Sequence, residues 1–166
     1  MSVAALNALA DGEARERFAR CCVSRRWIDG MLTGRPYDDA DAVRARARHV
    51  WQTLGEADWL EAFEGHPKIG DTASLRAKYA ATGDLAAREQ AGAATASDAV
   101  IERLARGNAA YEERFGFIFI VCATGRSAEE LCMMLEARLD NERSAELAIA
   151  AGEQLKILLL RLEHLL

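Results

Sequence analysis

A histidine followed by proline stands out in "LEAFEGHPKIGDTASL", residues 60–75, because the whole chain has only three histidines and two prolines. Proline disfavours helical backbone angles in the residue before it, so we expect His66 to be extended at the end of a helix. An imidazole fixed at such a turn, close to Lys68, suits an acid/base group or a group that contacts an anion. The alternative is that the pair His66-Pro67 only terminates the helix.

A carboxylate and an amide stand side by side at Glu89 and Gln90, in "LAAREQAG". Both side chains could simply face solvent. Their neighbours are alanines and a glycine, however, and small residues let another helix or a ligand approach closely. Both interpretations remain open from the residues alone.

Arg161 interrupts the apolar stretch "KILLLRLEHLL". An arginine between leucines either extends outward to solvent or pairs with an anion in a pocket. The three histidines have no metal-ligand spacing, so we expect no metal site. Glycine-rich phosphate-binding patterns and the serine-hydrolase elbow are also missing from the sequence, which gives no support to a nucleotide-binding or serine-hydrolase function.

Helices are expected to position these residues, since alanine, leucine, glutamate and arginine dominate the sequence. The run "FGFIFIVCATG" is the exception, and its aromatic and β-branched residues predict a buried extended segment or a strand without an obvious partner. The sequence therefore predicts an all-α fold, a single domain over residues 1–166 with roughly eight helices. Caps and apolar spacing place the main candidates at 2–9, 12–22, 24–31, 38–54 or 39–54 (capped by Asp38 or Asp39), 56–65, 72–79, 84–94, 97–115, 127–138 and 143–165.

Composition excludes several classes of partner. The net charge of −5 argues against nucleic-acid binding, and the longest apolar runs are too short to span a bilayer. The first residues lack the pattern of a secretory signal. The four cysteines have no ligand spacing and lie among apolar neighbours, which predicts reduced, buried thiols in a cytoplasmic protein.

Taken together and in order, several segments resemble the OHCU decarboxylase family, where OHCU is 2-oxo-4-hydroxy-4-carboxy-5-ureidoimidazoline. These segments are "SRRWIDGM", "RPYDD", "DWLEAFEGHPKIGD", "REQAG", "GNAAYEERFGFIFIVCATG" and "KILLLRLEHL". The resemblance covers nearly the whole chain. It implies an all-helical homodimer that converts OHCU to (S)-allantoin in urate degradation, with no cofactor and no metal.

The resemblance also implies roles for individual residues. By position, His66 matches the catalytic histidine of the family and Glu89 its catalytic carboxylate. One departure concerns Ala86, where some members carry a serine whose hydroxyl contacts the substrate. The positions implied to bind or line the substrate site are Pro67, Gln90, Phe117, Ile120 and Arg161.

Two other functions remain as alternatives. The chain could be a non-catalytic helical interaction module, in which side chains fill the region of His66 and Glu89. It could also be an enzyme of the same fold that acts on a related ureido or imidazoline acid, because one pocket can accept related acids.

Overall fold

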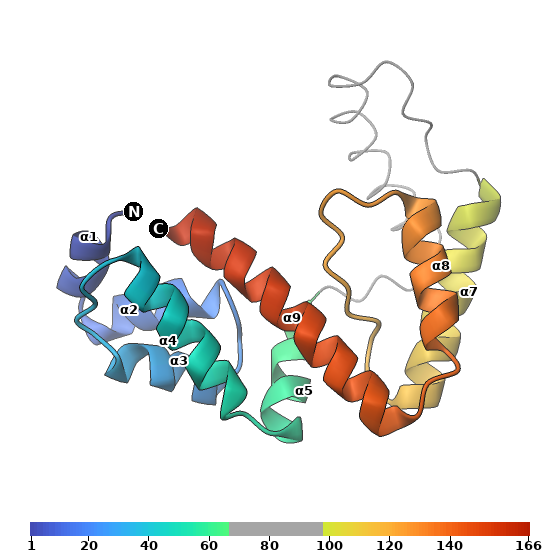
Figure 1. Ribbon diagram of the computed structural model, residues 1–166, viewed down its shortest axis with the longest axis horizontal. Helices are drawn as coiled ribbons and strands as arrows, with labels where there is room; N and C mark the ends of the chain where they lie inside the picture. Colours follow the sequence, from blue (N-terminus) through green and yellow to red (C-terminus); the bar gives the residue numbers. More distant parts are fainter. Residues whose placement is uncertain (67–97) are drawn as a thin grey trace, which may run out of the picture. The chain divides into compact units, whose positions relative to one another are not determined.

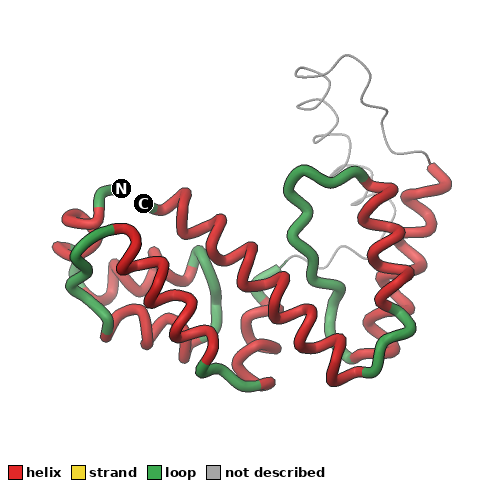
Figure 2. Tube along the Cα trace, in the orientation of Figure 1, coloured by secondary structure: helices red, strands yellow, loops and turns green. Residues whose placement is uncertain are grey.

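The computed structural model describes residues 1–66 and 98–166 (Figures 1 and 2). These residues form eight helices and no strand, which confirms the all-α prediction. The predicted helices at 72–79 and 84–94 lie outside the described residues. The described helices are α1 (Val3–Ala8), α2 (Asp11–Ala19), α3 (Arg25–Thr33), α4 (Ala40–Gln52), α5 (Glu56–Glu64), α7 (Asp98–Phe115), α8 (Ala128–Arg138) and α9 (Arg143–Leu165).

Side-chain caps fix several helix starts, as the sequence predicts. The hydroxyl of Ser24 accepts a hydrogen bond from the backbone N–H of Trp27 at the start of α3. The Asp39 carboxylate does the same for α4. At α8 the capping box is complete, because Ser127 accepts from the Glu130 N–H at 3.2 Å and Glu130 accepts from the Ser127 N–H at 2.7 Å.

The chain divides into two groups of contacting residues, and each is described separately. The first comprises residues 1–66 and 147–166, and the second includes residues 98–146. The prediction of one domain over residues 1–166 stays a prediction. In the first group, α1 to α5 and most of α9 surround an apolar core built on Leu6, Phe18, Trp27, Met31, Val43, Trp51, Leu158 and Leu162.

In the second group, α7 and α8 lie side by side (Figure 1). Gly107 of α7 permits this close approach, because a Cβ atom there would lie 2.5 Å from Leu135 of α8. Between these helices, residues 117–123 are extended without pairing into a sheet (Figure 2). The predicted extended segment is therefore present without a sheet; Phe117 and Ile120 are buried, and the other residues of 118–123 are only partly buried.

The cysteines are free thiols, and Cys21, Cys22 and Cys132 are buried as predicted. Burial raises the pKa of Cys21 to about 11 and that of Cys22 to about 12, so both stay protonated and unreactive near neutral pH. Cys122 departs from the prediction, because it is only partly buried. Among the described helices, none is long and apolar enough to cross a membrane.

The packing of α3 against α4 gives a prediction for Gly30. A Cβ atom at Gly30 would lie 2.6 and 2.8 Å from the two γ-carbons of Val50, whose β-branched side chain cannot rotate away easily. At Gly152 of α9 nothing lies within 4 Å of such an atom. Alanine improves helix propensity equally at both sites, by about 1 kcal/mol. We therefore expect Gly152→Ala to be more stable than Gly30→Ala by the overpacking penalty, about 1–3 kcal/mol.

Urea unfolding of the two variants and the wild type would measure this difference. Equal stability of Gly30→Ala and Gly152→Ala would show that α3 and α4 can separate without penalty.

Candidate active site

His66 follows the short helix α5, as predicted. The helix ends at Glu64, Gly65 caps it, and the backbone N–H of His66 donates to the carbonyl of Phe63 at 3.1 Å. The imidazole is partly buried. Its Nε2 atom lies 2.5 Å from Oε1 of Gln154 on α9, a residue 88 positions further along the chain. The last turn of α5 and the middle of α9 thus hold the ring between them.

Gln154 is fully buried, and its amide is only half satisfied. Oε1 contacts His66, whereas the Nε2 amide group has no hydrogen-bond partner within the described parts of the chain. Leaving a buried donor unsatisfied costs about 1–3 kcal/mol. Sequence reasoning missed Gln154, although the signal was present: a polar residue stands on the apolar stripe of α9, four residues before Leu158 and three after Ala151.

Arg161 lies on the same face of α9 as Gln154, seven residues or about two turns further on. Its guanidinium is partly buried and donates to the backbone carbonyl of Cys21 at 3.2 Å. The sequence left two alternatives for Arg161, extension to solvent or pairing with an anion in a pocket. A hydrogen bond to a backbone carbonyl is neither of them. It draws Arg161 toward the end of α2, where its positive charge opposes the effect of burial on the nearby thiols and lowers the pKa of Cys21 and Cys22 somewhat.

Phe117 and Ile120 belong to the second group of residues. Both side chains are buried, in the extended segment between α7 and α8. Pro67, Glu89 and Gln90, and also Ala86, lie outside the described residues. Of the seven predicted site residues, the structure therefore places His66 after α5 in contact with Gln154 of α9, Arg161 on α9 and, separately, Phe117 and Ile120 in one loop.

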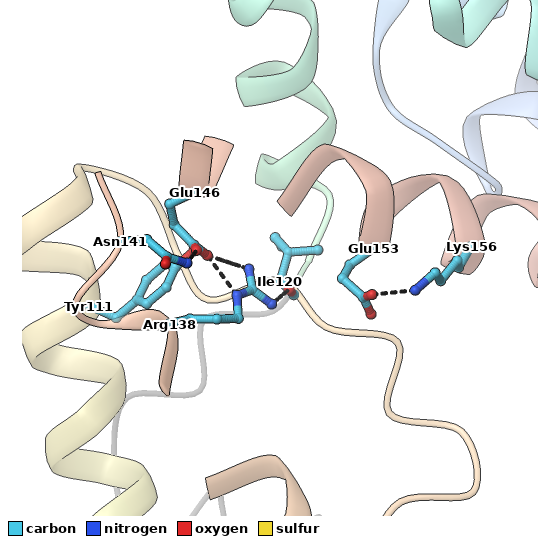
Figure 3. A network of polar contacts seen from close by, with 7 residues as sticks. All are labelled: Tyr111, Ile120, Arg138, Asn141, Glu146, Glu153 and Lys156. Atoms are coloured by element: carbon cyan, nitrogen blue, oxygen red, sulfur yellow. Dashed lines mark hydrogen bonds and ion pairs between the residues drawn. The ribbon is translucent and has the colours of Figure 1, made fainter. Parts of the chain in front are cut away.

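A buried polar network supports that loop, and the sequence interpretation missed it (Figure 3). Arg138 of α8 donates through Nη1 to the carbonyl of Ile120 at 2.9 Å and through Nε to Glu146 at 2.7 Å. Its guanidinium also lies 4.7 Å from the centre of the Phe119 ring, within range of a cation–π contact. Arg138 therefore fixes both the backbone and an aromatic side chain of the loop.

Glu146 is the acceptor at the centre of this network. It is fully buried and accepts hydrogen bonds from Arg138, from the Tyr111 hydroxyl and, at 2.7 Å, from Asn141 (Figure 3). Burial, together with the bond to Glu146, raises the pKa of the Tyr111 phenol far above its ordinary value. Tyr111 thus keeps its proton near neutral pH and donates it to Glu146.

A surface hollow between α3 and α4 contains none of the predicted site residues. Its cations already have partners, because Arg26 pairs with Asp58 at 3.2 Å and Arg46 donates to the carbonyl of Gly30 at 2.9 Å. We assign the hollow no role. It is lined by Arg26, Asp29, Gly30, Thr33, Arg46, His49, Val50 and Thr53.

Comparison with solved structures shows which proteins share this fold. The fold is that of a crystal structure of (S)-allantoin synthase, with a TM-score of 0.75 over 100% of this chain and 54% of that one, at 16% sequence identity. A second crystal structure, of OHCU decarboxylase in the presence of (S)-allantoin, is 36% identical. It matches with a TM-score of 0.73 over 90% of this chain and 96% of that one.

Sequence comparison identifies the family. A family model described as OHCU decarboxylase matches residues 7–163. The chain is 30% identical over 136 residues to 2-oxo-4-hydroxy-4-carboxy-5-ureidoimidazoline decarboxylase of Amia calva, covering 82% of this chain and 77% of that protein. It is 38% identical over 146 residues to the uric acid degradation bifunctional protein TTL of Arabidopsis thaliana, covering 87% of this chain but only 45% of that protein. The chain belongs to the OHCU decarboxylase family.

Proposed function

We propose that the protein decarboxylates OHCU to (S)-allantoin in urate degradation, which makes it a carboxy-lyase. The observation that carries this proposal is the family match over residues 7–163, together with the 36% identity and TM-score of 0.73 to an OHCU decarboxylase structure. The fixed position of His66 at the end of α5 adds a chemical reason, because it offers an acid/base group at the matched position.

The substrate can carry out much of this chemistry itself. Its carboxylate is attached to a ring carbon that also bears a hydroxyl and adjoins a C=N bond. When the bond to the carboxylate breaks, its electrons move toward the imine nitrogen, and CO2 leaves. The nitrogen takes up a proton, the hydroxyl loses its proton and the neighbouring carbon gains one, so that one proton is consumed overall and the product has the ring N–H, the carbonyl and the stereocentre of allantoin. The protein therefore has to orient the substrate, move protons and select one face.

In this proposal His66 and Glu89 move the protons. A neutral imidazole with an ordinary pKa of ~6.5 can accept the hydroxyl proton and return a proton near neutral pH. Arg161 and Gln90 would hold the ureido and ring carbonyl oxygens. Pro67 would fix the histidine, and Phe117 and Ile120 would line the pocket and exclude water. Excluding water matters because protonation from bulk solvent would give both enantiomers.

Three further features belong to the same proposal. The homodimer rests on the family resemblance. A cytoplasmic location rests on the cysteine content, and the single domain over residues 1–166 on the length of the chain and the extent of the family match.

The activity can be tested with substrate made in place. Urate would be converted by urate oxidase and hydroxyisourate hydrolase, the protein added, and circular dichroism recorded as allantoin forms. We expect a rapid (S)-allantoin signal that scales with the concentration of the protein. The matched control omits the protein, so that OHCU decays spontaneously to racemic allantoin without a dichroic signal.

Two outcomes would contradict the proposal. A trace equal to the spontaneous decay would exclude OHCU as the substrate and direct attention to related ureido acids. The absence of turnover with any such acid would favour the helical interaction module.

A further inference from the structure

The contact between Gln154 and His66 determines where the imidazole carries its proton. Oε1 of an amide only accepts hydrogen bonds, so a contact of 2.5 Å to His66 Nε2 requires a proton on that nitrogen. In the neutral ring the lone pair is then on Nδ1. The same carbonyl also favours the protonated imidazolium, because that form donates from Nε2 as well.

Because Gln154 is buried, its contact with His66 can hold the imidazole ring in one orientation. Gln154 has no exposed surface, and it lies near the middle of α9, a helix of 23 residues. Its side chain therefore has little freedom to move. Its amide N–H group has no partner among the residues that the structure describes. An apolar side chain of similar length would avoid this unsatisfied donor, so the amide nitrogen of the glutamine carries a cost in stability at the position where its oxygen contacts His66.

We propose that Gln154 is a positioning residue of the site, which holds His66 in the tautomer protonated at Nε2 and so makes Nδ1 the nitrogen that accepts a proton. The catalytic relevance of this tautomer rests on the proposed function. The tautomer itself does not, because it follows from the contact with Gln154.

The direct test is nitrogen NMR of the protein labelled with ¹⁵N in its histidine rings, with the His66 signals assigned by their loss in His66→Ala. Above the pKa of the ring, we expect an N–H-type signal from Nε2 and a lone-pair-type signal from Nδ1. The reverse pattern would overturn the proposal, whether or not the protein decarboxylates OHCU. The expected pattern in a protein without decarboxylase activity would support the tautomer and reject the proposed function.

Two variants test the consequence for catalysis. Gln154→Met has a similar length and no polar group, so we expect its thermal midpoint to equal or exceed that of the wild type. Its kcat should fall at least about 10-fold, since an imidazole free to adopt the wrong tautomer is a poor base. Gln154→Glu keeps an acceptor for Nε2–H but adds a negative charge, so the acidic limb of its kcat–pH profile should move to higher pH.

Gln52→Met, at an exposed glutamine that ends α4, is the matched control and should leave both kcat and the pH profile unchanged. A purely structural role for Gln154 predicts the opposite pattern: lower stability in Gln154→Met, with unchanged kcat in the folded protein and no shift of the profile in Gln154→Glu. That result would overturn the positioning role.

Discussion

Replacing His66 by alanine should lower kcat/KM for OHCU by about 10²–10⁴, the usual effect of removing a general acid/base group. The remaining turnover should also lose stereochemical control, because protons would then come from solvent. Circular dichroism and absorbance, recorded together, separate these effects: absorbance follows the loss of OHCU, and the dichroism that remains once OHCU is consumed reports the excess of (S)-allantoin.

His49→Ala is the matched control for this experiment. His49 is exposed on α4 and has no role in the proposed site, so this variant should retain wild-type activity. His66→Ala removes the hydrogen-bond partner of the buried Gln154 carbonyl, so its fold should be checked by far-ultraviolet dichroism. Wild-type turnover in a folded His66→Ala variant would show that His66 is not the acid/base group.

Replacing Arg138 by methionine should destabilise the protein by about 3–5 kcal/mol, because it leaves Glu146 buried without its cation. The substitution also removes the donor to the carbonyl of Ile120. For a chain of this length, such a loss lowers the thermal midpoint by on the order of 10 °C. Differential scanning calorimetry would measure the shift.

Arg103→Met provides a matched comparison. Arg103 of α7 also pairs with a glutamate, Glu136 of α8, at 2.6 Å, but both side chains are more than 40% exposed. Exposed pairs contribute about 0–1 kcal/mol, so this variant should unfold close to the wild type. If Arg138→Met and Arg103→Met lost the same small amount of stability, the buried network would not be what holds the loop.

The helices could largely be predicted from the sequence because their signals are local. Ser127 and Glu130 form a capping box within four residues, and the apolar spacing of α9 predicts its range of 143–165. The extended run after α7 was also recognisable from its β-branched and aromatic residues. Its lack of a strand partner follows from what surrounds it, since the described chain offers only helices for it to pack against.

The polar partners of the candidate site residues, within each group, could not be predicted in the same way. Apolar periodicity reports which positions are buried but not which polar residue will meet which partner. Gln154 meets a histidine 88 residues away, and Glu146 meets Tyr111 from 35 residues away. A polar residue on an apolar stripe indicates that a partner exists, and only the folded chain identifies it.

The two turns of α9 between Gln154 and Arg161 also bear on how this family can change over time. Substitutions between these positions leave the two side chains at a fixed spacing of about 10 Å along one face of the helix. Inserting or deleting a single residue would rotate one relative to the other by about 100°. This stretch of α9 should therefore keep a constant length and an apolar residue at the buried Leu158, while exposed positions such as Lys156 and Leu160 can vary without changing the spacing between Gln154 and Arg161.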